Sequence, residues 1–215
     1  MSTTVYLIRH GESEANNLTM FAGHIDVELT AQGKKQADVT AEYLEKQNFR
    51  PSAIYSSDLT RAYSTAESIA KRLNMPIVKN EGLREINAGE WEGVKFDELI
   101  KKFKGSYGVW LENIGRSHCD GGESVAELQK RVVSTVATLA DKHKNEVIFV
   151  FTHATPIRVL AAHCMNKSLD EVKDIPWATN ASVSKFIYDN GGFELVEYGR
   201  DDFMGELITK FASNV

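Results

Sequence analysis

The sequence predicts an α/β fold in which a mostly parallel central sheet lies between two layers of helices, a three-layer sandwich. Two observations carry this prediction: continuous apolar runs that suit buried strands, and segments of helical apolar periodicity between those runs. A third observation, a tight-turn signal near the carboxyl end, indicates that the last two strands pair antiparallel.

Three segments are predicted as the parallel strands. Residues 5–8 and residues 147–151 are unbroken apolar runs, which suit strands buried on both faces. Residues 53–55 form a third and weaker candidate. Because these strands alternate with helical segments, we expect them to be parallel members of one sheet.

Apolar residues spaced three or four positions apart predict three amphipathic helices. These residues are Ala37, Ala41 and Leu44 in the first helix, Leu59, Ala62, Ala66, Ile69 and Leu73 in the second, and Val125, Leu128, Val132, Val136 and Leu139 in the third. Their spacing places them on one face of each helix, which is the face expected to cover the sheet.

A hairpin is predicted at the carboxyl end of the sheet. Residues 183–188 and 193–198 flank the turn Asp189-Asn190-Gly191-Gly192. The Asn-Gly pair tolerates the positive φ angles that a tight hairpin requires. We expect this pair of strands to close the sheet in the antiparallel sense.

The length of 215 residues suits a single domain over residues 1–215. Composition changes between residues 82 and 122, where eight of the fifteen glycines lie, and residues 94–116 carry five basic residues against three acidic ones. We therefore expect a helical lid insertion at about residues 94–122, placed over an anionic substrate. The alternative is a solvated helical excursion with ordinary surface lysines.

The charge and the apolar content exclude several classes of protein. The net charge of −5 argues against a nucleic-acid or anionic-membrane surface spread over the molecule. The apolar run at residues 147–151 falls far short of the ~20 residues that a membrane helix needs. Residues 1–9 do not resemble a secretion signal, and two cysteines form no disulfide framework. We expect a soluble, cytoplasmic protein without nucleic-acid or membrane partners.

Polar clusters directly follow the three predicted parallel strands. They are Arg9-His10-Gly11, Ser56-Ser57-Asp58 leading to Arg61, and Thr152-His153. Carboxyl ends of parallel strands form the ligand crevice of an open α/β sheet, so these clusters should converge. Two arginines and two histidines suit a phosphoryl group, because guanidinium groups match phosphate oxygens and imidazole can attack or donate. Taken singly, His153 also fits a structural role and Arg61 a helix surface.

Five ordered blocks of sequence resemble the histidine phosphatase superfamily, in the branch of cofactor-dependent phosphoglycerate mutases and related phosphatases. The blocks are residues 7–16 (Leu-Ile-Arg-His-Gly-Glu-Ser-Glu-Ala-Asn), residues 29–33 (Leu-Thr-Ala-Gln-Gly), residues 56–62 with Thr65 and Ala66, residues 83–86 with Gly89 and residues 91–93, and residues 151–154 (Phe-Thr-His-Ala). The resemblance implies a phosphoglycerate mutase-like fold and a phosphohistidine mechanism.

The resemblance also implies a role for each matching residue. His10 would attack phosphorus, while Arg9, Arg61 and His153 would hold the phosphoryl oxygens. Asn16 would add an amide donor, and the amino end of a helix that starts at Ser57 or Asp58 would favour an anion. Glu85 would be the general acid. The alternative is that Glu85 is a surface carboxylate paired with Arg84. The remaining expected substrate contacts are Phe21, Ala22, Gly23 and Ala154.

The resemblance implies neither a metal nor a cofactor, because the arginines supply the positive charge. The adjacent pairs His118-Cys119 and His163-Cys164 lack the spacing of a zinc site. Members of the acid phosphatase branch of the superfamily carry an aspartate after the second histidine, whereas this chain has Ala154. Glu85 therefore stays the acid candidate.

Hydrolysis of a small phosphomonoester is the favoured activity, with phosphoglycerate mutase activity as the alternative. The chain lacks arginines that the mutases carry before the turn at Phe21 and directly after Glu85, where it has Met20 and Ile86. Met20, Phe21, Ile86 and Trp91 would instead offer the leaving group an apolar wall, or belong to the core. A catalytically silent phosphoester- or partner-binding module is the second alternative. The physiological substrate, the oligomeric state and the role of residues 203–215 stay open.

Overall fold

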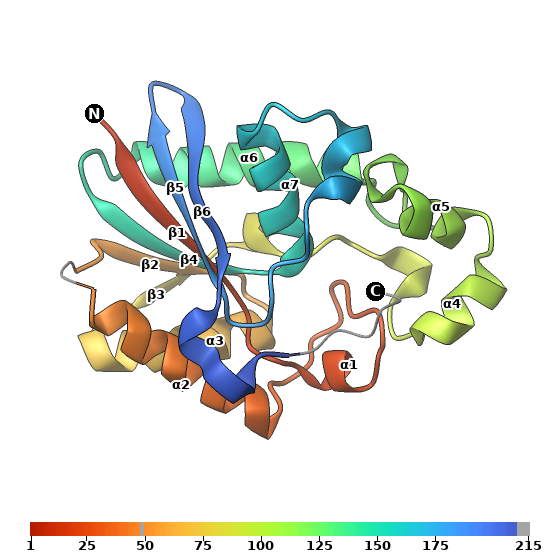
Figure 1. Cartoon of the computed structure of the whole chain (residues 1–215), viewed down its shortest axis with the longest axis horizontal. Helices are drawn as coiled ribbons and strands as arrows, with labels where there is room; N and C mark the ends of the chain where they lie inside the picture. The colour runs from red at the N-terminus through yellow and green to blue at the C-terminus, as the bar shows by residue number, and fades with distance from the viewer. Residues whose placement is uncertain (48–49, 210–215) are drawn as a thin grey trace.

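The computed structural model describes residues 1–47 and 50–209, and within them one six-stranded sheet runs through the centre of the molecule (Figure 1). Its strands are β1 (Thr3–Arg9), β2 (Ala53–Ser56), β3 (Ile77–Lys79), β4 (Val147–Thr152), β5 (Val183–Asp189) and β6 (Gly192–Arg200). The spatial order is β3-β2-β4-β1-β5-β6; β1 to β4 pair in parallel, β5 pairs antiparallel with β1, and β6 pairs antiparallel with β5. The predicted mostly parallel sheet is confirmed.

Helices cover both faces of this sheet, because its central strands bury side chains on both sides. Val5 and Leu7 of β1 belong to one apolar cluster, and Tyr6 and Ile8 belong to the other. The covering helices are α2 (Ala31–Glu45), α3 (Thr60–Leu73), α6 (Val125–Asp141) and α7 (Ala154–Cys164). Figure 1 shows α6 and α7 on one side of the sheet and α2 and α3 on the other, which confirms the three-layer arrangement.

The three predicted helices form, and local capping explains two of their starts. The Thr30 hydroxyl accepts a hydrogen bond from Gly33 N at the start of α2, and the Ser124 hydroxyl accepts one from Glu127 N at the start of α6. The expected start of α3 at Ser57 or Asp58 is wrong, because the helix begins at Thr60. The Asp58 carboxylate instead forms an ion pair with Arg84.

Several further elements carry no clear sequence pattern. The edge strand β3 has three residues, and α7 is buried along residues 154–162, so it has no polar face to reveal a helical period. The short helices are α1 (Glu14–Asn17), α4 (Phe96–Lys102), α5 (Ser106–Glu112) and the 3-10 helices η1 (Glu81–Leu83), η2 (Gly89–Trp91), η3 (Ile114–Arg116), η4 (Leu169–Asp174) and η5 (Asp202–Leu207).

The segment at residues 94–122 extends beyond the carboxyl ends of the strands, where Figure 1 shows α4 and α5. An aromatic cluster fixes it to the rest of the chain. The ring of Phe21 lies 5.6 Å from the ring of Trp91 and 5.1 Å from that of Trp110, measured between centroids. Trp91 is fully buried, and its indole N–H donates to Asp120 Oδ2 at 2.8 Å.

The predicted hairpin is confirmed. Strands β5 and β6 pair antiparallel, with Asp189 opposite Gly192. Asn190 and Gly191 at the turn have φ angles of 50° and 81°, the positive values that this two-residue turn requires. The hairpin therefore closes the sheet beyond β1.

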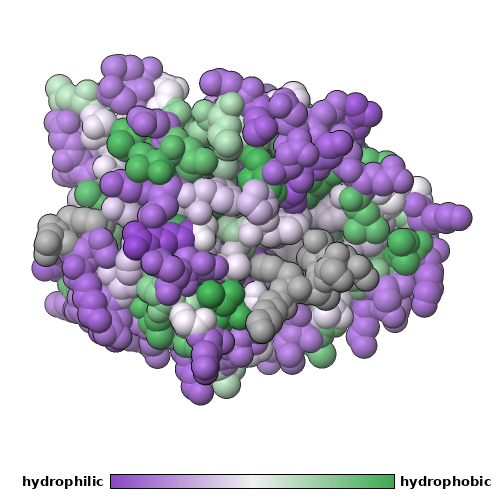
Figure 2. All heavy atoms as spheres, viewed as in Figure 1, coloured by the Kyte–Doolittle hydropathy of each residue, from purple (hydrophilic) through white to green (hydrophobic). Residues whose placement is uncertain are grey.

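The described part of the carboxyl tail packs against α2. The ring of Phe203 stacks on that of Tyr43 with centroids 4.1 Å apart, and Gln36 Nε2 donates to Leu207 O. Residues 210–215 lie outside the described residues. On the face drawn in Figure 2, hydrophilic side chains predominate, and the hydrophobic ones gather in separate small groups. No helix in the described ranges is long and apolar enough to cross a bilayer.

Candidate active site

His10 directly follows β1, and its environment keeps the imidazole neutral. The residue is 4% exposed, and Nδ1 lies 2.7 Å from Gly11 O, to which it donates a hydrogen bond. The lone pair is therefore on Nε2. Burial holds the pKa of His10 well below its usual range, and the charges of Arg61 and Arg9 lower it further. The residue combines a buried position with a nucleophilic nitrogen.

Two buried arginines flank His10. Arg9 Nη1 donates to Ala178 O at 2.6 Å, while Arg61 donates to Ile25 O at 2.9 Å and to Gly23 O at 2.7 Å. Burial lowers the pKa of both arginines to about 10, which leaves both cationic at neutral pH. Backbone carbonyls thus hold both guanidinium groups beside the imidazole, and the arrangement suits a phosphoryl group.

His153 follows β4, the neighbour of β1 in the sheet, and is fully buried. Its ring centroid lies 5.2 Å from that of His10. Nε2 contacts Ser57 Oγ at 2.9 Å, and Nδ1 has no hydrogen-bond partner among the described residues. Burial, followed by the charge of Arg61, lowers the pKa of His153 well below its usual range. The sequence places Ser57 in a polar cluster but gives no sign of its contact with His153.

Asn16 is held with its amide nitrogen toward the site. Its Oδ1 accepts hydrogen bonds from Ser13 N and from Asn180 Nδ2, both at 3.1 Å. Because the carbonyl end is occupied, Nδ2 is the end that can donate to an anion. Asn180 Nδ2 also donates to His10 O at 3.1 Å, so this residue holds two parts of the site. Asn180 lies outside every block of sequence that resembles the family, so the sequence shows no sign of this role.

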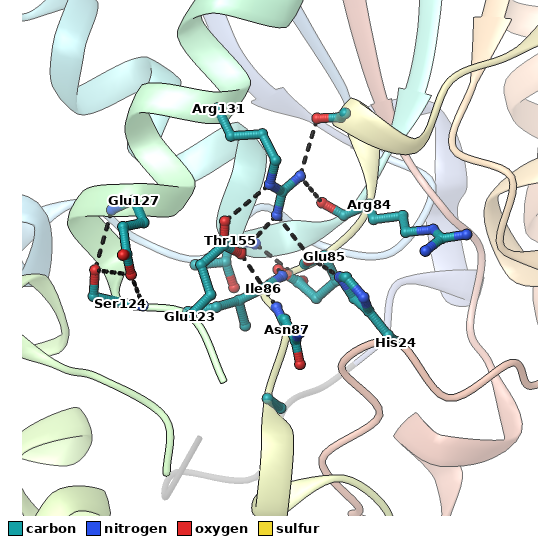
Figure 3. Close-up of polar contacts among 12 residues, drawn as sticks. His24, Arg84, Glu85, Ile86, Asn87, Glu123, Ser124, Glu127, Arg131 and Thr155 are labelled. Atoms are coloured by element: carbon teal, nitrogen blue, oxygen red, sulfur yellow. Dashed lines mark hydrogen bonds and ion pairs between the residues drawn. The ribbon is translucent and has the colours of Figure 1, made fainter. Parts of the chain in front are cut away.

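Glu85 approaches from the loop after η1, and Figure 3 shows its surroundings. Its carboxylate accepts hydrogen bonds from Ile86 N at 2.8 Å and from Thr155 N at 3.3 Å. The alternative of a surface pair with Arg84 is wrong, because Arg84 makes a bidentate ion pair with Asp58. Glu85 is thus available to a bound ligand.

The loop that carries Phe21, Ala22 and Gly23 closes one side of the site. Gly23 has a φ of 52°, and a Cβ there would lie 2.5 Å from Glu92 Oε1. That carboxylate accepts hydrogen bonds from the backbone of His24 at 2.7 Å and Ala88 at 3.2 Å. Glycine at position 23 lets the loop approach Glu92 and present its carbonyl to Arg61.

These residues surround one cavity of about 100 Å³. Of the expected site residues, all but the more deeply buried His153 line it: Arg9, His10, Asn16, Phe21, Ala22, Gly23, Arg61, Glu85 and Ala154. Further lining residues are Ser13, Met20, Phe96, Tyr107, Trp110, Thr155 and Trp177. The structure therefore brings the predicted residues together.

The expected apolar wall is partly wrong. Met20 and Phe21 line the cavity, but Ile86 and Trp91 are fully buried in the core. Their places are taken by Phe96, Tyr107, Trp110 and Trp177, which also line an adjoining groove of about 1100 Å³. Among the described residues, no group of three or more His, Cys, Asp or Glu side chains could hold a metal ion.

Comparison with known proteins gives a consistent result. A model of the histidine phosphatase superfamily (branch 1) matches residues 5–201. The chain is 34% identical to Phosphoserine phosphatase 1 of Hydrogenobacter thermophilus over 154 residues, which are 72% of each chain. It is 32% identical to Phosphoglycerate mutase-like protein 4 of Arabidopsis thaliana over 200 residues, 91% of this chain and 84% of that one.

The fold has close counterparts among solved structures. The structure of YhfR of Bacillus stearothermophilus superposes with a TM-score of 0.89 at 30% sequence identity. The superposition covers 94% of this chain and 99% of that chain, so both the sheet and the segment at residues 94–122 fall largely within it.

Proposed function

Because the chain belongs to the histidine phosphatase superfamily, branch 1, we propose that it hydrolyses a small phosphomonoester through a phosphohistidine at His10. One observation carries the proposal most directly. The Nε2 lone pair of a neutral, buried His10 faces the cavity between two cationic arginines. The chain is a phosphoric monoester hydrolase, as its phosphatase relatives support.

In the first step His10 Nε2 attacks phosphorus, and the bond between phosphorus and the leaving oxygen breaks. Arg9, Arg61 and His153 Nδ1 hold the phosphoryl oxygens, and Asn16 Nδ2 adds a neutral donor. Protonated Glu85 gives its proton to the leaving oxygen, so an alcohol departs and a carboxylate remains.

In the second step a water molecule attacks phosphorus and the bond to His10 Nε2 breaks. The Glu85 carboxylate takes a proton from this water, which yields inorganic phosphate and restores the acid. The hydrogen bonds from Ile86 N and Thr155 N hold the carboxylate in place during both steps. No metal ion or cofactor is part of this scheme.

Hydrolysis is favoured over phosphoglycerate mutase activity. The cationic side chains among the described lining residues are Arg9 and Arg61, both committed to the transferred phosphoryl group. A second phosphate or a substrate carboxylate would face Met20, Phe21 and other apolar groups there. The likeness to a phosphoglycerate mutase-like protein keeps mutase activity as the second candidate.

The test is product analysis with phosphoserine and with 3-phosphoglycerate, each in the presence of a chelator. The 3-phosphoglycerate reaction is run with and without 2,3-bisphosphoglycerate, and free phosphate is scored against 2-phosphoglycerate. Phosphate release that survives the chelator supports the proposal. Efficient formation of 2-phosphoglycerate favours the mutase, and no turnover of these esters or of p-nitrophenyl phosphate favours a silent binding module.

We further propose that residues 94–122 act as a lid within a single domain and that the protein works in the cytoplasm. The short helices α4 and α5 place Phe96, Tyr107 and Trp110 on the cavity, which supports the lid. Cys119 and Cys164 are both free thiols, as expected in a reducing compartment. The proposed partner is the phosphomonoester substrate, with no nucleic acid or membrane involved.

A further inference from the structure

Arg131 of α6 makes an unusually complete set of hydrogen bonds with the loop that carries Glu85 (Figure 3). Its Nη1 donates to Gly82 O and Arg84 O, both at 3.0 Å, and its Nη2 donates to Glu85 O at 3.0 Å. Nε and Nη2 also donate to Glu123, at 2.9 and 2.7 Å. All five N–H groups of the guanidinium are therefore used.

Glu123 extends this set of contacts to the other side of Glu85. Its Oε2 accepts a hydrogen bond from Asn87 N at 3.2 Å, while its own backbone N–H donates to Asn87 O at 2.8 Å. Arg131 thus binds the carbonyl groups of Gly82, Arg84 and Glu85, and Glu123 binds the backbone of Asn87. The ion pair fixes the loop on both sides of the proposed general acid.

Limited solvent access strengthens these contacts. The side chains of Arg131 and Glu123 are 25% and 15% exposed, so the pair is less screened than an ordinary surface pair. The Glu85 carbonyl accepts from His24 Nε2 at 2.9 Å as well as from Arg131, which occupies both of its lone pairs. Two side-chain donors therefore hold the Glu85 carbonyl in place.

We propose that Arg131 is a positioning residue that keeps the Glu85 carboxyl group at the leaving oxygen; this inference rests on the proposed function. Arg131 does not line the cavity; it lines a separate hollow with Glu123. It acts through the loop backbone, which sets where the Glu85 side chain begins. Lysine has three donors on a single atom and cannot span three carbonyl oxygens and a carboxylate.

The test compares kcat/KM for p-nitrophenyl phosphate and for an alkyl phosphate, because this ratio reports the first chemical step for each ester. The p-nitrophenolate ion leaves without a proton, whereas an alkoxide needs one from Glu85. We expect Arg131→Lys to lower kcat/KM about 10- to 100-fold for the alkyl ester, and less than about 3-fold for the aryl ester.

Arg84→Lys is the matched control. It removes a bidentate ion pair of similar exposure from the adjacent loop position, but the partners of Arg84 are the carboxylates of Asp58 and Glu81 and not the loop carbonyls. We expect this variant to lower kcat/KM only slightly, and by the same factor for both esters. Glu85→Gln should reproduce the alkyl-selective loss, and adding Arg131→Lys to it should cause little further loss, because both changes act on one proton transfer.

Several results would overturn the inference. If Arg131→Lys lowers kcat/KM equally for both esters, Arg131 has a general structural role. If kcat/KM falls for neither ester, Arg131 does not position Glu85. If Arg131→Lys does not fold, Glu123→Gln, which keeps the volume but removes the charge, takes its place with the same expectation. Should Glu85→Gln itself show no selectivity, the acid assignment fails, and that failure is separate from a failure of Arg131 alone.

Discussion

At the scale of single residues, the site depends on which nitrogen of each histidine carries a proton. In His10 the bond from Nδ1 to Gly11 O leaves the lone pair on Nε2. In His153 the contact of Nε2 with Ser57 Oγ decides the state of Nδ1, which faces no partner among the described residues. If the Ser57 hydroxyl donates to Nε2, His153 presents Nδ1–H to a phosphoryl oxygen.

Ser57→Ala should therefore weaken phosphoryl binding by His153. We expect kcat/KM to fall about 5- to 10-fold, the effect of one lost orienting hydrogen bond. Nitrogen-15 NMR of the imidazole should report the Nδ1–H tautomer in the unsubstituted protein and a change in Ser57→Ala. Ser56→Ala is the control, because the hydroxyl of this equally buried serine donates to Ser57 O. An unaltered tautomer in Ser57→Ala would contradict the assignment.

The lowered pKa values of His10 and His153 also predict how stability depends on pH. Histidine in the unfolded chain titrates near pH 6.5, so below about pH 6.5 the unfolded state binds more protons than the folded state. The free energy of unfolding should accordingly fall as pH decreases from about 7.5 to 5.5.

Chemical denaturation at several pH values measures this slope. His10→Gln removes one of the two buried titrating groups and should make the slope shallower. His163→Gln, at an exposed position of α7, controls for the loss of a histidine outside the cavity. A slope in His10→Gln as steep as that of the unsubstituted protein would show that His10 does not contribute.

At the scale of elements, two opposed segments form the aromatic side of the cavity. Phe96 of α4 and Tyr107 and Trp110 of α5 line the cavity together with Trp177, which follows η4. The rings of Trp110 and Trp177 are nearly parallel, at an angle of 24° with centroids 6.4 Å apart. Arg158 lies 4.2 Å over the opposing Trp177 ring and holds it in this orientation.

These rings predict a preference for aryl leaving groups. Trp177→Leu should raise KM for an aryl phosphate about 3- to 10-fold, since ring contacts contribute about 0.5–1.5 kcal/mol beyond burial. KM for an alkyl phosphate should change little. Trp177→Phe keeps an aromatic ring, so its KM for the aryl phosphate should stay near that of the unsubstituted protein. Equal effects on both esters in Trp177→Leu would show that Trp177 only supports the fold.

Elements with strong local patterns could be predicted from the sequence, and the others could not. The buried runs of β1 and β4 and the periodic faces of α3 and α6 were recognisable, because tertiary packing and local pattern agree there. Strand β3 is too short for a pattern, and α7 is buried on all sides along residues 154–162. Arg131 is part of α6, where its sequence position resembles that of any helix-surface arginine.

At the scale of the whole molecule, the sheet topology brings the predicted clusters together. Because β4 lies between β1 and β2, the residues that follow these three strands meet at one edge. The matching blocks of sequence identified Arg9, His10, Arg61 and His153 there. Asn180 and Trp177 could not be predicted, since they come from a segment without a matching block and reach the site only through the fold. The net charge of −5 equally conceals a local cationic cavity.

Trapping of phosphate on His10 tests the phosphohistidine mechanism most directly. The protein is mixed with a phosphorus-32-labelled phosphomonoester in the presence of a chelator, quenched in alkali, where phosphohistidine survives, and mapped by peptide. We predict up to one phosphate per chain on the peptide that contains His10, absent from His10→Gln. Steady release of phosphate without a labelled His10 peptide would contradict the phosphohistidine mechanism.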